Sequence, residues 1–189
     1  MKKRLFYLLK VSLFFFFIIA LISCGNDIKE VQDFLADKNL PIGVAKNVNL
    51  VHTDSGRVKT KLISPLLNDF SNRKEQPYQE FPEGIMITNF DKFGDSVTLM
   101  ANYCKTYTKT GISEVNDNVV VINYKDKSKL YTEQLFWDQT THYIYTEKPF
   151  KLITKTDTIH GKGFESNEDL SKVTMKDISG TVYVTEIKD

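Results

Sequence analysis

The stretch LYTEQLFWD, residues 130–138, decides the fold class. It gathers β-branched and aromatic residues in one short run after a polar turn cluster at residues 125–128, and this composition is typical of a strand that follows a turn. The same pattern recurs from Val44 onward, between further turn clusters at residues 54–56, 91–95 and 155–158. No amphipathic helix pattern competes in this region, so the sequence predicts an all-β protein.

Nine runs of this composition predict nine strands, at residues 44–52, 57–64, 84–90, 96–104, 117–124, 129–137, 142–154, 158–165 and 172–187. The last run is expected to break near Gly180. Nine or more short strands with short links predict a stack or roll of sheets. The chain is also long enough for one domain with a buried core.

A weak internal repeat refines this prediction. At a constant offset of 31, Leu99, Ala101, Tyr103, Cys104, Ile112, Glu114 and Val119 match Leu130, Thr132, Gln134, Leu135, Tyr143, Tyr145 and Phe150. A third copy starts 29 residues later at Ile159, and an earlier copy starts at Leu62 with an insertion at residues 68–79. Repetition at this period predicts stacked hairpin units, which leave an unpaired strand edge at each end of the stack.

Four parts of the sequence resemble the strand motifs of the LptC family, the periplasmic component of the lipopolysaccharide export machine. They are NVVVI at 118–122, LYTEQLFWD at 130–138, GKGF at 161–164, and Gly180. The resemblance covers residues 40–185 and implies a twisted β-jellyroll built from repeated hairpin units, with open edge strands at both ends. Asp117 departs from the family pattern, which usually has Gly before NV.

The resemblance also implies partners and a location. The domain is expected to receive lipopolysaccharide from an inner-membrane ABC transporter in an apolar groove, and to pass it to a periplasmic LptA-like bridge protein of the same fold. This places it on the periplasmic side of the inner membrane. The two end strands would be the partner edges, the first facing the transporter and the second the bridge, with Val48, Leu50, Val182 and Val184 as candidates.

The N-terminal sequence predicts export. Lys2, Lys3 and Arg4 precede an apolar run at residues 5–22, and Ser23 then leads to Cys24. Residues 21–24, LISC, resemble a bacterial lipobox, in which the Cys is lipidated and the peptide in front of it is removed. The alternative is an uncleaved transmembrane helix, because a run of 18 residues, interrupted only by Lys10, can just span a bilayer.

The first interpretation divides the chain into three parts. Residues 1–23 form a lipoprotein signal peptide, residues 24–41 a polar tether with short helical tendency, and residues 42–189 the LptC-like domain. The lipid on Cys24 would hold the protein to the membrane, a departure from the better-known members of the family, which are anchored by a transmembrane helix.

Charge and cysteine content argue against nucleic-acid binding and against a disulfide framework. Removing residues 1–23 leaves 21 basic and 24 acidic residues, a formal charge of −3. A nucleic-acid-binding protein needs an excess of basic residues, so this function is excluded. Acylation of Cys24 would leave Cys104 without an intramolecular partner, which excludes a disulfide framework. Cys104 lies in an apolar run and is interpreted as a buried, inert thiol.

A carrier for acyl chains needs a covered apolar groove, because each exposed methylene costs about 0.8 kcal/mol. The candidates are apolar residues with the alternation of inward-facing strand positions: Ile85, Ile87, Val97, Leu99, Ala101, Tyr103, Val119 and Val121. The same alternation would also fill a sandwich core, so both interpretations stay open. Gly161, Gly163 and Gly180 are interpreted as structural glycines that permit a bend or a close backbone approach.

No pattern of catalytic or metal-binding residues is found in the sequence. His52, His142 and His160 are far apart and show no metal-ligand spacing, and the sequence has no glycine-rich phosphate loop or nucleophile elbow. The protein is therefore predicted not to be an enzyme and to need no metal or cofactor. The main alternative to lipid transfer is a structural or surface β-rich lipoprotein; a lipid-modifying enzyme would need ionisable groups clustered in a cleft.

Overall fold

The computed structural model describes residues 33–34 and 38–181, with side chains as far as Ser179. Its strands are β1 (Gly43–Asp54), β2 (Arg57–Phe70), β3 (Tyr78–Phe81), β4 (Ile85–Phe90), β5 (Ser96–Ala101), β6 (Tyr103–Tyr107), β7 (Ile112–Asn123), β8 (Lys129–Asp138), β9 (Tyr143–Ile153), β10 (Thr158–Asn167), β11 (Val173–Met175) and β12 (Ser179–Thr181). All neighbouring strands are antiparallel and belong to one 12-stranded sheet. The all-β prediction is confirmed.

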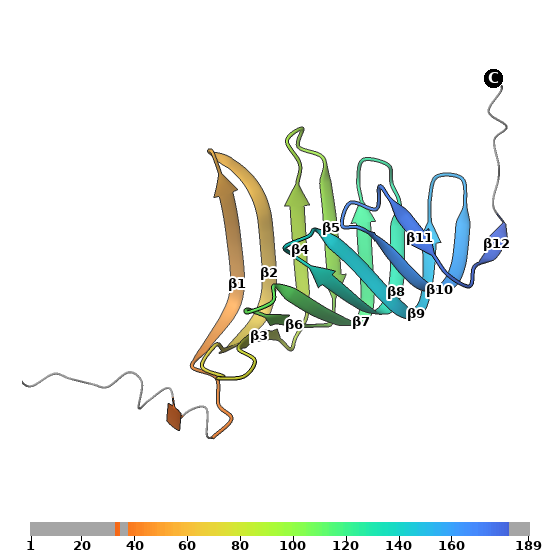
Figure 1. The fold of residues 1–189 in the computed structure, drawn as a ribbon. Coiled ribbons are helices and arrows are strands. Elements are labelled where there is room, and N and C mark those ends of the chain that lie inside the picture. The colour runs from red at the N-terminus through yellow and green to blue at the C-terminus, as the bar shows by residue number, and fades with distance from the viewer. Residues whose placement is uncertain (1–32, 35–37, 182–189) are drawn as a thin grey trace, which may run out of the picture. The chain divides into compact units, whose positions relative to one another are not determined.

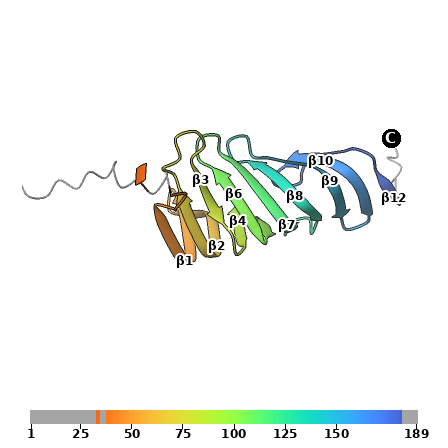
Figure 2. The same ribbon diagram turned by 90° about the horizontal axis from the view of Figure 1, so that it is seen from below.

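The sheet folds into two layers because the long strands bend and contribute to both. The first half of β2 pairs with β4, while its second half pairs with β3. β7 likewise pairs with β6 through its first half and with β5 through its second half. The circuit β7–β5–β4–β2–β3–β6 therefore returns to β7, and Figures 1 and 2 show the layers that result. This arrangement is the expected jellyroll.

We call the layer that contains β1, β4, β5 and β12 the front layer, and the layer that contains β3, β6 and β11 the back layer. β1 stands at one end of the front layer, and β11 and β12 stand at the far end of the row of strands (Figure 1). Within the described residues β1 pairs with β2 alone, so its other edge is open. At the far end, β11 and β12 each pair with β10 alone within the same residues, and the predicted edge strand beyond residue 181 lies outside them.

Left-handed backbone positions mark the bends. Asp117 and Asn118 have φ values of 65° and 54°, where the register between β7 and β8 shifts, and Gly163 has a φ of 83°, where β9 and β10 shift. Gly84, with a φ of 98°, separates β3 from β4. Glycine adopts this region freely and Asp or Asn at modest cost, so Asp117 and Asn118 can form this bend without a glycine.

The internal repeat corresponds to one row of inward-facing residues in the front layer. Strand pairing runs from Leu50 through Leu62, Ile87, Leu99, Val121, Leu130 and Leu152 to Ile159. Leu62, Leu99, Leu130 and Ile159, which begin the four predicted copies, occupy alternate places in this row. One copy of the repeat is therefore one hairpin, and the stack of hairpins is the jellyroll.

The strand predictions fail where a strand is broken or very short. The predicted strand 96–104 is two strands separated at Asn102, and β7 begins at Ile112 rather than at residue 117. β2 continues to Phe70 and β3 begins at Tyr78, so the insertion placed at residues 68–79 is reduced to a loop at 71–77. These boundaries depend on pairing with distant strands, which local composition does not encode.

The core contains a buried hydroxyl without a partner. Among the described side chains, Ser166 Oγ is fully buried and makes no hydrogen bond, whereas the equally buried Ser113 Oγ bonds to Thr106 Oγ1 at 2.8 Å and to Gln139 Nε2 at 2.8 Å.

We expect Ser166→Ala to raise the free energy of unfolding by about 1 kcal/mol, because it removes an unsatisfied polar group from the interior. Ser113→Ala is the matched control and should lower the free energy of unfolding by about 1 kcal/mol, since it removes the hydrogen bonds to Thr106 and Gln139. Urea unfolding at an unchanged m-value measures both. A loss of stability in Ser166→Ala would contradict the assignment of an unpaired hydroxyl.

Candidate functional site

The inner row of the front layer changes from exposed to buried along its length. Leu50 on the edge strand is 54% exposed, while Ile87 is 5% and Val121 is 2% exposed. The row is therefore open at the β1 end, and it is covered by the back layer from β4 onward. Leu130 and Leu135, which lie on the two halves of β8, are completely buried between the layers.

Six of the eight groove candidates are buried in the cluster between the layers: Ile85, Ile87, Leu99, Ala101, Val119 and Val121. Val97 is partly buried and packs against this cluster. These positions agree with a groove lining and with a packed core alike, so the groove assignment remains a prediction.

Tyr103 departs from the expected alternation. The break at Asn102 shifts the pattern by one residue, so that Cys104 is fully buried between the layers and Tyr103 lies on the opposite face. There its hydroxyl donates to Glu80 Oε1 at 2.7 Å, and burial together with this carboxylate raises the pKa of the phenol above its ordinary value. Burial also raises the pKa of the Cys104 thiol to about 11, which keeps it protonated and unreactive at neutral pH.

A polar cleft opens between the layers at one side of the roll, with a volume of about 410 Å³. Its walls include Asn89, Asp91, Asp95, Lys125, His142 and Glu168. Beneath it lies an apolar cavity of about 20 Å³, which shares Asn89, Val97 and Glu168 with the cleft and reaches Leu99, Val121 and Trp137. This inner cavity holds about one water molecule, so side chains fill the space between the layers below the cleft.

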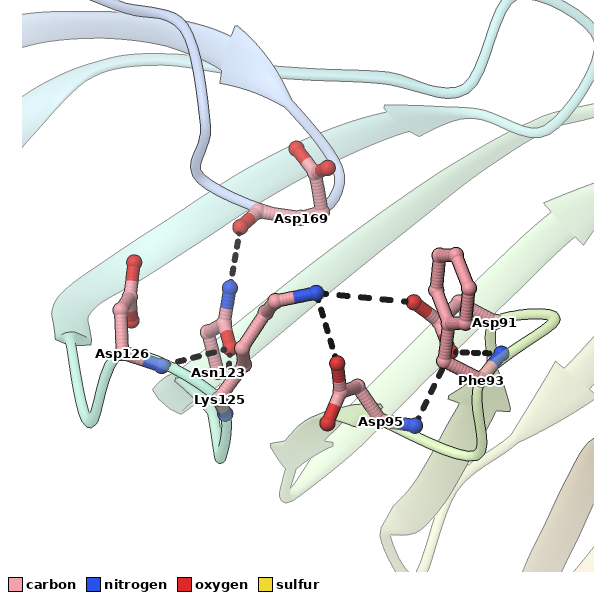
Figure 3. A network of polar contacts seen from close by, with 7 residues as sticks. All are labelled: Asp91, Phe93, Asp95, Asn123, Lys125, Asp126 and Asp169. Atoms are coloured by element: carbon pink, nitrogen blue, oxygen red, sulfur yellow. Dashed lines mark hydrogen bonds and ion pairs between the residues drawn. The ribbon is translucent and has the colours of Figure 1, made fainter.

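Lys125 organises the charge in the cleft. Its ammonium lies 2.7 Å from an Asp95 oxygen and 3.9 Å from an Asp91 oxygen, as Figure 3 shows. The hydrogen bond to Asp95 raises the pKa of the Lys125 ammonium above its ordinary value, so the group stays charged. Asp91 also accepts hydrogen bonds from the backbone nitrogens of Phe93 and Asp95, which orders the β4–β5 turn.

The loop at residues 168–172, which we call the closing loop, joins β10 to β11 in the back layer and contacts the front layer. Asn123 Nδ2 on β7 donates to the backbone oxygen of Asp169 at 2.7 Å (Figure 3). On the other side, Trp137 Nε1 donates to Glu168 Oε2 at 3.0 Å, and His142 Nδ1 shares a hydrogen bond with Glu168 Oε1 at 3.1 Å. Leu170 is 6% exposed and joins the core cluster.

Sequence reasoning did not find the closing loop. Leu170 is a single apolar residue in a polar segment, and Asn123, Trp137 and Glu168 are far apart in the chain. The partial signal was the lone Trp of the sequence, because a buried indole needs an acceptor for its N–H.

The structural role of Gly161, Gly163 and Gly180 stays a prediction. The structure describes the space around Gly161 and Gly163. A Cβ at Gly161 would lie 2.7 Å from Phe150 Cε1 and 3.0 Å from the backbone oxygen of Lys176. Gly163 has a left-handed backbone, and a Cβ there would lie 3.0 Å from Lys176 Cδ. Gly180 pairs with Ile159 at the end of the inner row.

The predicted edge residues are described in part. Val48 is buried at 8% exposure and Leu50 is exposed, both on the open edge strand β1. Val182 and Val184 lie outside the described residues, as do the predicted signal peptide and Cys24. Within the described part of the chain, no helix is both long and apolar enough to cross a membrane.

The described residues also give no support to metal binding. In residues 33–34 and 38–181, no group of three or more His, Cys, Asp or Glu side chains is placed to hold a metal ion. The three histidines do not come together, since His52 lies on β1, His142 beside β9 and His160 on β10.

A family model described as "Lipopolysaccharide-assembly, LptC-related" matches residues 12–184. The match covers nearly all of the sequence, including every described strand. No curated protein matches the chain.

Proposed function

Because this chain belongs to the LptC-related family of lipopolysaccharide-assembly proteins, we propose that its jellyroll carries the acyl chains of lipopolysaccharide between the two sheet layers. Family membership itself gives a role in lipopolysaccharide export on the periplasmic side of the inner membrane, as a transport component. The carriage of lipid in this groove is the finer step that the proposal adds.

The inner row is the observation that supports carriage. It is apolar at every place from Leu50 to Ile159, and it runs across the front layer without a charged side chain. Exposing an acyl chain of about twelve carbons to water is unfavourable by on the order of 10 kcal/mol of free energy. A carrier must therefore offer a continuous apolar surface of this kind. Leu50 at the exposed end gives the chain a place to enter.

The proposal includes two protein partners and an attachment to the membrane. The open edge of β1 receives lipopolysaccharide from an inner-membrane ABC transporter, because unpaired backbone groups of an edge strand bind by strand addition. The C-terminal edge passes the lipid to an LptA-like bridge of the same fold. A lipid on Cys24 holds the domain at the membrane, and two or more acyl chains are expected there because one chain binds only marginally.

One observation favours a different function. The space beneath the cleft holds only about 20 Å³, and such tight packing suits a structural or surface β-rich lipoprotein that carries no lipid. The two functions differ in what contacts the inner row in cells.

Photo-crosslinking distinguishes them. We expect a photoreactive residue at Leu99 or Val121 to label lipopolysaccharide in cells, because both side chains face the interior. Met100 and Val120 are matched controls, since they are the next residues on the same strands and face outward, and they should give little or no label. Equal labelling at inward and outward positions would contradict carriage between the layers. The fold of each variant is checked by circular dichroism.

A further inference from the structure

The closing loop divides the space between the layers. Glu168 and Asp169 form part of the wall of the polar cleft of about 410 Å³. On the other side of the loop, Leu170 lines a second cleft of about 230 Å³, together with Leu152 and Val173. Both clefts lie between the tips of front-layer strands and the back layer, and the loop is the wall between them.

The floor of the two clefts is continuous. The apolar cavity beneath the larger cleft is lined by Leu99 and Val121, and the second cleft is lined by Leu152. These residues are members of the same inner row, with Leu130 between Val121 and Leu152. The row therefore stays apolar from one cleft to the other, and it is the closing loop that separates the two clefts.

We infer that the two clefts are halves of a single acyl-chain groove, and that the closing loop is a gate between them. The inference rests on the proposed function, and it adds a second acyl-chain subsite, at Leu152, Leu170 and Val173, and the element that controls access to it. With the loop withdrawn, a chain held at Leu99 extends over Leu130 to Leu152 and onward toward the C-terminal edge.

The geometry of the loop suits a part that opens. Its link to the front layer includes the Asn123–Asp169 hydrogen bond, the packing of Leu170 and the electrostatic attraction between Lys125 and Asp169. Its Glu168 bonds hold it to its own back layer. Leu170 also has a φ of 59°, in the left-handed region that a branched side chain rarely adopts. This strain favours release of the loop when another apolar group replaces Leu170.

Asn123→Asp tests the gate by replacing the amide nitrogen that donates to the Asp169 backbone oxygen. An aspartate cannot donate to the Asp169 oxygen, but it keeps the acceptor that binds the backbone nitrogens of Lys125 and Asp126, so the β7–β8 turn is retained. Asn89→Asp is the matched control. It adds the same charge to the same cleft and keeps its acceptor for Thr60 Oγ1, and it does not touch the loop.

Two measurements on the full chain follow. Backbone hydrogen exchange at Leu170 and Ser171 should become about tenfold faster in Asn123→Asp and stay unchanged in Asn89→Asp, with core amides such as Val115 unaffected. With purified lipopolysaccharide as the probe, a photoreactive residue at Leu152 should gain label relative to one at Leu99 in Asn123→Asp alone.

The outcomes separate the gate from carriage. Suppose that Leu99 is labelled, but that Asn123→Asp changes neither the ratio of label at Leu152 to label at Leu99 nor the hydrogen exchange of the loop. This result overturns the gate and leaves carriage intact. Absence of label at both positions in all proteins overturns carriage and the gate with it. If Asn123→Asp does not fold, Leu170→Ala replaces it, because it removes the apolar packing that holds the loop between the layers and leaves the bonds of Asn123 and Glu168 in place. It is expected to give the same two changes.

Discussion

Gly161→Val should destabilise the jellyroll by about 3 kcal/mol, the upper part of the range for overpacked cores. A Cβ at Gly161 would lie 2.7 Å from Phe150 Cε1 and 2.8 Å from Cζ, far inside van der Waals contact. Phe150 cannot move away easily, because it is 4% exposed and packs against the fully buried ring of Phe164 at a centroid distance of 5.2 Å. The Lys176 backbone oxygen also lies 3.0 Å from the same position.

Urea unfolding measures this loss as a lower midpoint at constant m. Gly43→Ala is the control, since its new Cβ would meet only Asp69 Cβ at 3.7 Å and its φ is not left-handed, so stability should be unchanged or slightly raised. Adding Phe150→Leu to Gly161→Val should restore part of the loss by making room. Wild-type stability in Gly161→Val would show that the close approach of Phe150 is not a constraint.

A proline on the outer side of β1 should reduce recovery of the transporter by about tenfold or more, which corresponds to about 1.4 kcal/mol of binding free energy. β1 is a 12-residue edge strand that pairs with β2, and its side chains are nearly all exposed. Proline has no N–H to donate to an added strand. Successive residues of β1 point their N–H groups alternately toward β2 and toward the free edge. Of Asn49→Pro and Leu50→Pro, one therefore removes an N–H from the free edge and the other removes one from the pairing with β2.

The outward member of this pair should lose the transporter while the domain keeps its stability, and the inward member should also disturb the pairing with β2. Asn49→Thr and Leu50→Val keep the backbone donor and the β propensity, and they should bind as the wild type does. Co-purification from membranes measures the transporter, and thermal unfolding checks each domain. Normal recovery with both prolines in folded protein would exclude β1 as the docking edge.

Much of the fold could be predicted from local composition. The runs around LYTEQLFWD and NVVVI are strands in the structure, and the repeat that joins Leu62, Leu99, Leu130 and Ile159 follows one row of the front layer. These features are predictable because β-branched and aromatic residues favour a pleated, half-buried surface, and each hairpin repeats the same requirement.

The breaks in the strands could not be predicted in the same way. Asn102 separates β5 from β6, so that Cys104 instead of Tyr103 shares the buried face of Leu99 and Ala101, although the residues around it read as one alternating run. β3 exists because β2 and β6 lie on either side of the short segment Tyr78–Phe81. A strand of this length has little preference of its own, and pairing with neighbours that are distant in sequence decides it.

The sequence by itself determined that this protein is an all-β stack of hairpins with an apolar face on each unit, because composition and period are local properties of the chain. Only the tertiary structure decided where that face is open. It brought Asn123, Trp137 and His142 to one loop and inserted Leu170 between the layers, so that one row of aliphatic side chains lies beneath two separate clefts. A hydrogen bond between residues 46 positions apart depends on how two layers meet, and no local pattern contains that information.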